Sequence, residues 1–149
     1  MVRIAWPGWW LGLLVGTGPP VAAQVRDSIP PVELGENYPN PFYPSTTIPF
    51  DIRPEVCARG YRPLVKLEIL NVIAQVVAVP VVAENQTQRL DGIRLGCGGY
   101  KAYWDGKYLD GQREVMTGVY WCRLVVDGRP YTRKLIVQRH VTSPRTGTR

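Results

Sequence analysis

Turn-forming residues interrupt this chain so often that a long helix has little room in it. Glycine and proline together account for 29 of the 149 residues, about a fifth, against an average usage of about 12%. Inside a helix, proline costs about 3 kcal/mol and glycine about 1 kcal/mol relative to alanine. The chain therefore favours short strands joined by turns over a bundle of helices.

Between these breaks, apolar residues alternate with polar ones, which is the period of a half-buried strand. The segment Leu64–Asn71 shows the pattern clearly, because Val65, Leu67 and Ile69 share one face. The same alternation predicts strands at Thr46–Arg53, Gln75–Val82, Gly99–Trp104, Val119–Val126 and Tyr131–Gln138. Two of these contain a proline, Pro49 and Pro80, and proline favours an edge strand or a bulge.

Short strands separated by turns predict an all-β domain, a small antiparallel β-sandwich of about seven strands. Its core is expected to contain the inward-facing residues of those strands, namely Ile48, Phe50, Ile52, Val65, Leu67, Ile69, Trp104, Tyr120, Leu124, Leu135 and Val137. Asp127-Gly128 is a turn dipeptide typical of a tight hairpin. This hairpin sets Arg133 opposite Cys122 on the same face, so we expect a bulge or a register shift around Pro130.

The first 23 residues have the pattern of a secretory signal peptide. Arg3 supplies a positive charge, Trp9–Val15 is a short apolar run, and small residues end at Ala23, where cleavage is expected. The run is shorter than the ~20 residues that span a bilayer. We therefore expect an exported protein without an integral membrane span after cleavage, located in the periplasm, at the cell surface or outside the cell. Residues 24–33 are expected to form an extended linker, and residues 140–149 a flexible basic tail.

The three cysteines are spaced too widely for a zinc site. Cys57 and Cys97 lie in glycine-containing loops that can meet at one end of a sandwich, and export permits a disulfide between them. Cys122 falls on the inward face of its strand, which indicates a buried free thiol.

Neither catalysis nor metal binding is expected. A nucleophilic cysteine needs a positioned base, and the single histidine, His140, lies in the tail. Asp105, Asp110 and Glu114 suggest calcium, but a glycine and a tyrosine occupy positions where an EF-hand loop needs carboxylates. We expect no enzyme activity, no cofactor and no nucleic-acid partner. The net charge of +6 permits contact with anionic surfaces.

Five short motifs follow one another in the order found in a known family. The chain carries LGENYPNPF (Leu34–Phe42) with PSTTI (Pro44–Ile48), a strand ending in an asparagine turn (Val65–Gln75), WDG (Trp104–Gly106), GVY (Gly118–Tyr120) and a basic-apolar closing strand (Arg133–Val137). Together these resemble the C-terminal sorting domains of the bacterial type IX secretion system, which overlap with the immunoglobulin-like domain of flagellar hook-capping proteins.

The resemblance implies an immunoglobulin-like sorting domain over residues 34–139. The residues that carry it, and that would serve in packing or recognition, are Asn37, Tyr38, Pro39, Asn40, Pro41, Phe42, Trp104, Asp105, Gly106, Gly118, Tyr120, Arg133 and Lys134. In the packing interpretation, the asparagines cap turns while Tyr38 and Phe42 seal one end of the sandwich. In the recognition interpretation, a secretion receptor reads this segment or the charged final hairpin.

Two functions remain open. The first is a non-catalytic sorting or cell-surface attachment domain whose partner is a protein of the secretion apparatus. The alternative is a stand-alone immunoglobulin-like binding or structural module that docks on an envelope protein or an anionic envelope glycan. Tyr103 and Trp121 point away from the expected core, and such aromatic side chains either form a sugar-binding platform or cover cross-strand neighbours.

Overall fold

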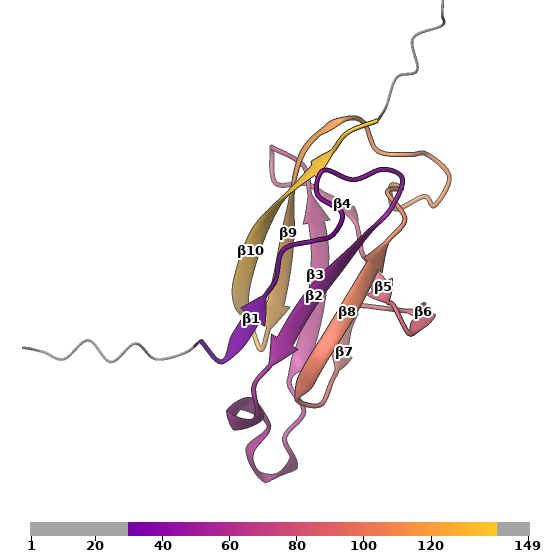
Figure 1. The fold of residues 1–149 in the computed structure, drawn as a ribbon. Coiled ribbons are helices and arrows are strands. Elements are labelled where there is room, and N and C mark those ends of the chain that lie inside the picture. The colour runs from indigo at the N-terminus through magenta and orange to yellow at the C-terminus, as the bar shows by residue number, and fades with distance from the viewer. Residues whose placement is uncertain (1–29, 140–149) are drawn as a thin grey trace, which may run out of the picture.

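Two β-sheets pack face to face in the computed structural model, which describes residues 30–139 (Figure 1). Sheet A has the strand order β1-β2-β8-β5-β6, and sheet B has the order β10-β9-β3-β4, with β7 also paired to β3. The bounds are β1 (Val32–Leu34), β2 (Thr46–Ile52), β3 (Leu64–Leu70), β4 (Val76–Ala78), β5 (Val81–Val82), β6 (Asn85–Arg89), β7 (Asp91–Arg94), β8 (Gly98–Trp104), β9 (Gly118–Val126) and β10 (Arg129–Val137), with one 3₁₀ segment, η1 (Pro54–Gly60).

The named strands all pair antiparallel, so the predicted all-β sandwich is confirmed. The predicted signal peptide and basic tail lie outside the described residues. Within residues 30–139, no helix is long and apolar enough to cross a membrane.

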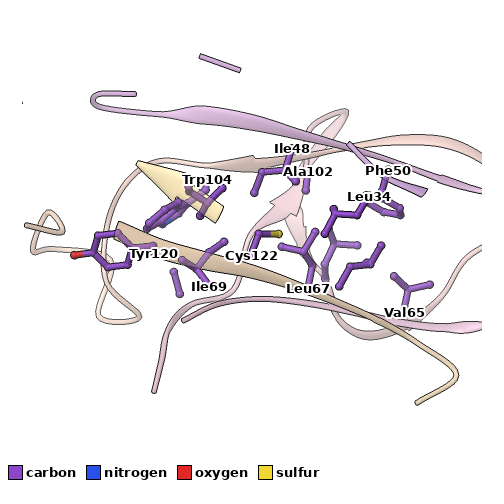
Figure 2. Close-up of a cluster of buried hydrophobic side chains, with 14 of the residues drawn as sticks. Leu34, Ile48, Phe50, Val65, Leu67, Ile69, Ala102, Trp104, Tyr120 and Cys122 are labelled. Carbon is purple, nitrogen blue, oxygen red and sulfur yellow. The ribbon is translucent and has the colours of Figure 1, made fainter. Parts of the chain in front are cut away.

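The core lies between the sheets, as the alternation predicts (Figure 2). All eleven expected core residues are buried. Ile48, Phe50 and Ala102 of sheet A face Leu67 and Cys122 of sheet B (Figure 2). Two further buried residues, Leu90 and Val115, lie outside the strands and outside the alternating pattern.

Three strands are absent from the sequence prediction because they lack its signal. β1 has three residues and begins inside the segment predicted as linker, while β6 has the sequence NQTQR and is exposed throughout. β7, Asp91–Arg94, is mostly exposed as well. β1 alternates buried and exposed residues but is only three residues long, and β6 and β7 contain no buried residue, so none of the three shows a sustained apolar alternation.

The valine-rich segment predicted as one strand, Gln75–Val82, forms two strands in different sheets. β4 pairs with β3 in sheet B, whereas β5 pairs with β8 in sheet A. Pro80 lies between them and cannot donate the backbone hydrogen bond that a continuing strand needs. The expectation of a single strand is therefore wrong, because the chain crosses from one sheet to the other at this proline.

Pro49 also behaves differently from the prediction, because β2 is not an edge strand. β2 lies between β1 and β8. The Pro49 carbonyl accepts a hydrogen bond from Gly35 N (2.9 Å), just beyond the end of β1. In an antiparallel ladder the nitrogen and the carbonyl of one residue face the same neighbouring strand, so the nitrogen of Pro49 also faces Gly35. The missing N–H of Pro49 therefore faces the place where the short β1 has ended, and the paired part of the ladder loses no bond.

The final hairpin has the expected turn without the expected irregularity. Asp127 and Gly128 both have positive φ, 48° and 81°, as the predicted two-residue turn requires. Pairing then runs from Arg129 to Val137 with no shift, which corrects the predicted bulge around Pro130. Arg133 does stand opposite Cys122, but β10 is the edge of sheet B. The arginine side chain therefore reaches past the core, where Nε donates to Leu34 O (2.8 Å).

The predicted disulfide between Cys57 and Cys97 is present, with the two Cα atoms 5.9 Å apart. It joins η1 to the segment immediately before β8, and so ties the long connection between β2 and β3 to sheet A. Cys122 is a buried free thiol, as expected. Burial raises the pKa of this thiol to about 12.

Removing the disulfide should lower stability. The bond joins residues that are 40 positions apart. For a loop of that length, the chain-entropy model gives a stabilisation of up to about 4 kcal/mol. In urea titrations, we expect the free energy of unfolding of the Cys57→Ala/Cys97→Ala protein to fall by a large part of this amount. The reduced wild-type protein should match the double variant. Equal unfolding free energies for the oxidised wild type and the double variant would contradict the assignment.

Cys122 should resist alkylation as long as the protein stays folded. A free thiol of pKa about 8.5 ionises between about pH 7 and pH 10, and its reaction with iodoacetamide accelerates accordingly. With a pKa of about 12, native Cys122 should show almost no modification over this range. Mass spectrometry should detect one modified thiol only after denaturation. Modification of the folded protein at neutral pH would show that the site is open.

Candidate functional site

Most of the predicted motif residues meet at one end of the sandwich, which we call the motif end. It comprises the loops Asn37–Pro44 and Asp105–Thr117 together with the strand ends beside them. The strand register brings these together, because Thr46 pairs with Trp104 and Gly118 pairs with Val137. Motifs separated by as many as 96 positions thus become neighbours.

Asn37 organises the first loop from inside. Its side chain is buried, and Nδ2 donates to Pro39 O and to Thr46 Oγ1, both at 2.9 Å. The Thr46 hydroxyl in turn donates to Pro39 O (2.9 Å). The amide therefore satisfies polar groups that the turn buries, and this confirms the predicted turn-stabilising role for Asn37.

Asn40 and Phe42 bind the loop to the last strand. Phe42 N donates to Ile136 O (2.9 Å), and Gln138 N donates to Phe42 O (3.1 Å). Ile136 N donates to Asn40 Oδ1 (3.1 Å). Asn40 thus holds β10 instead of capping a turn of its own loop, which corrects the prediction.

Three aromatic rings from different motifs fill the motif end. Phe42 packs edge-on against Trp104 (5.2 Å between centroids), and Trp104 packs edge-on against Tyr120 (5.9 Å). Phe42 seals this end as predicted, whereas Tyr38 is half exposed and does not. Trp104 Nε1 donates to Lys107 O (2.9 Å). Tyr120 donates to Met116 O (3.0 Å), and burial raises the pKa of Tyr120 to about 12.

The WDG motif turns the chain out of β8. Asp105 Oδ1 accepts from Lys107 N (3.1 Å), and Val115 N donates to Gly106 O (2.8 Å). Gly106 has a φ of 71°, and a Cβ on it would collide with the carbonyl oxygen of Pro44. Only glycine satisfies both constraints at position 106. Asp105 and Gly106 therefore both stabilise the turn, the first through its side chain and the second through its backbone conformation.

The acidic residues considered for calcium each have their own cation. Arg113 binds Asp110 (2.6 Å) and holds the pKa of that carboxyl down to about 2. Glu114 pairs with Arg139 (3.0 Å), and Asp105 lies 4.0 Å from Lys107. The described residues contain no group of three or more potential ligands placed to hold a metal ion.

Arg133 and Lys134 do not join the motif end but lie farther back along β10. Arg133 Nη1 also lies 3.9 Å from Glu36 Oε1, so this residue links β10 to the chain after β1. The loop that contains Phe42 covers the edge of β10 at Ile136 and Gln138. By the alternation of the ladder, Thr132 and Lys134 present the remaining outward backbone groups of this edge.

A hollow of about 390 Å³ lies beside the motif end, and the sequence gives no signal for it. Its walls come from the crossover after β4, from β6 and from the loop after β8, and they include Arg89, Tyr103, Lys107 and Tyr108. These residues lie in separate segments that only the fold brings together. Tyr103 and Trp121 stand on the outer faces of different sheets, so the two do not form one platform.

No protein-family model, no curated protein and no solved structure matches this chain. The resemblance to sorting domains stays a prediction that rests on the motif residues alone.

Replacing Gly106 should destabilise the fold far more than replacing a comparable glycine. Gly111 has a similar φ of 67° but open space around its Cα. We expect Gly111→Ala to cost about 1 kcal/mol from left-handed backbone strain alone. Gly106→Ala should cost at least about 2 kcal/mol more because of the collision with Pro44. Urea denaturation of the two variants measures the difference, and equal losses would show that the loop yields freely.

Proposed function

We propose that this chain is an exported, non-catalytic sorting or cell-surface attachment domain of the type IX kind, recognised as a folded module. The observation that carries the proposal is that residues of the first motif, WDG, GVY and the end of the closing strand meet at one end of the sandwich, where they hold the last strand in place. Phe42 joins the first motif to the last through two backbone hydrogen bonds to β10. The motif residues thus fix the position of the element expected to be recognised.

The recognised element is the uncovered part of β10. An unpaired strand edge binds a partner strand through backbone hydrogen bonds, and side chains then supply specificity. Thr132 and Lys134 offer the backbone groups. Lys134 adds a positive charge with no carboxylate within ion-pair distance among residues 30–139. The partner is a protein of the secretion apparatus with an exposed strand or an acidic edge.

Export agrees with the covalent chemistry of the domain. A disulfide persists in the periplasm, at the cell surface and outside the cell, whereas it is rare in the cytoplasm. The Cys57–Cys97 bond is therefore compatible with the location that the predicted signal peptide implies.

The hollow beside the motif end favours a second candidate, a stand-alone module that docks on an envelope protein or an anionic glycan. Arg89 has no carboxylate partner within the described part of the chain, and Lys107 shares only a long ion pair. Tyr103 and Tyr108 add aromatic surface. A cleft of this size with a few convergent polar groups fits a small ligand.

The sorting proposal is tested by fusing residues 24–149 behind a periplasmic reporter in a host that has the secretion system. The fusion begins before β1, because Val32 is part of sheet A and Arg53 N donates to Pro31 O (3.0 Å). We expect the reporter to reach the cell surface. Lys134→Gln should reduce surface delivery about threefold or more, as expected for a charge at a docking edge.

Lys101→Gln is the matched control, because Lys101 is an exposed strand lysine on the outer face of sheet A. This variant should be delivered like the wild type. A second fusion that ends at Arg139 shows whether the tail is needed. If every fusion stays in the periplasm while an established sorting domain reaches the surface, the sorting role fails and the binding module becomes the better account.

A further inference from the structure

Exposed apolar side chains are concentrated at the motif end. Ten large apolar or aromatic side chains are exposed among the described residues, and only Tyr61 and Leu64 belong to the opposite end. The other eight are Tyr38, Tyr43, Val72, Ile73, Leu109, Met116, Val119 and Trp121. Scattered exposed apolar residues are normal on a protein surface, but a grouped set marks an interaction site.

The strand register places these eight residues together. β3 ends at Leu70, which pairs with Trp121 near the start of β9, so the turn after β3 lies at the same end as the loop before β9. The bridges Tyr38–Thr47 and Phe42–Val137 bring in the loop before β2. Figure 1 shows these loops at one end of the sandwich, where β10 also finishes.

The most exposed pair, Val72 and Ile73, is held at the tip of an ordered turn. The exposed fractions of these two side chains are 73% and 70%. Asn71 closes the turn beneath them, because its Oδ1 accepts from Ile73 N (3.1 Å) and Gln75 N (2.9 Å) and its backbone pairs with Gln75. Polar residues usually fill such a tip, so two fixed aliphatic side chains require another explanation.

An exposed methionine and three half-exposed aromatic residues lie at the same end as this turn. Met116, from a separate loop, is as exposed as this pair, with 72% of its surface accessible. Tyr38, Tyr43 and Trp121 are each about half exposed, and such rings prefer the boundary between water and hydrocarbon. The aliphatic residues stand on two separate loops with aromatic rings beside them, an arrangement that enters a fluid layer more readily than it matches a flat protein surface.

The net charge of the chain, +6, favours an anionic layer. The carboxylates of Asp105, Asp110 and Glu114 are already paired with cations. Arg139, where the described chain ends, is fixed here because Nη2 donates to Val115 O (3.0 Å) and its guanidinium lies over the Tyr43 ring. The ten residues that follow contain two arginines and no acidic residue.

We propose that the motif end docks on an anionic lipid bilayer, with Val72, Ile73 and Met116 inserted into the layer. Tyr38, Tyr43 and Trp121 then lie at the headgroup level, and the net positive charge of the chain attracts the lipid phosphates. This inference goes beyond the sorting role, since it requires no secretion apparatus.

The protein to test is the chain from Gln24 to Arg149. Both sheets and every buried core residue of the described chain lie within residues 32–137, so this chain contains the complete folded unit. Its two tryptophans are the buried Trp104 and the half-exposed Trp121. A change in emission on contact with lipid therefore reports on Trp121.

The experiment mixes this chain with vesicles of phosphatidylglycerol and phosphatidylcholine in equal amounts, and measures flotation and tryptophan emission. We expect the protein to float with the vesicles and its emission to shift to shorter wavelength. Val72→Ser/Ile73→Ser should weaken vesicle binding about tenfold or more, because two aliphatic side chains no longer leave water. Pure phosphatidylcholine vesicles and high salt should weaken binding as well.

Leu64→Ser is the matched control, since Leu64 is an exposed aliphatic residue at the opposite end. It should bind vesicles like the wild type, and thermal unfolding should show that both variants remain folded. Absence of wild-type binding, or equal losses in the two variants, overturns the proposal. Sedimentation that shows dimers abolished by Val72→Ser/Ile73→Ser, without vesicle binding, also overturns it and assigns this end to self-association. A failed reporter fusion leaves vesicle binding unaffected, so the two proposals fail separately.

Discussion

The attachment of Phe42 to β10 joins the two halves of the sandwich at the motif end. Its backbone forms a short parallel bridge with Val137, through hydrogen bonds to Ile136 and Gln138, while its ring packs against Trp104. The loop between β1 and β2 of sheet A thereby covers the edge of the last strand of sheet B. Since buried backbone groups must be paired and rings fill the space between the sheets, this contact fixes both the strand end and the core beneath it.

The same attachment divides the edge of β10 into a covered and an open part. Asn40 and Phe42 cover the far part at Ile136, while Arg133 reaches across to Leu34 near the middle. The stretch from Thr132 to Lys134 is what remains for a partner strand. So short an open stretch leaves little of β10 for unspecific edge-to-edge association, which suits the proposed sorting role.

Much of the candidate site could be predicted from local rules, and the errors have physical causes. Asp127-Gly128 and the inward positions of β3 follow from turn chemistry and period two. The disulfide followed from two glycine-containing loops that a sandwich brings together. The prediction of an edge strand at Pro49 and of a single strand through Pro80 is wrong because a missing N–H matters only where that N–H would bond a neighbouring strand. Pro49 faces the end of β1, and Pro80 sits where the chain leaves one sheet for the other.

The sequence by itself determined the eleven expected core residues of the predicted strands, since alternation fixes the side of a strand on which each side chain lies. It determined the hairpin turn at Asp127-Gly128 and the absence of a long helix from residues 30–139. Only the tertiary structure decided which sheet each strand joins, where Arg133 finds its partner, and that eight exposed apolar side chains share one end. Those outcomes depend on pairings between distant segments, which local alternation does not encode because it constrains a strand's face and leaves its neighbour open.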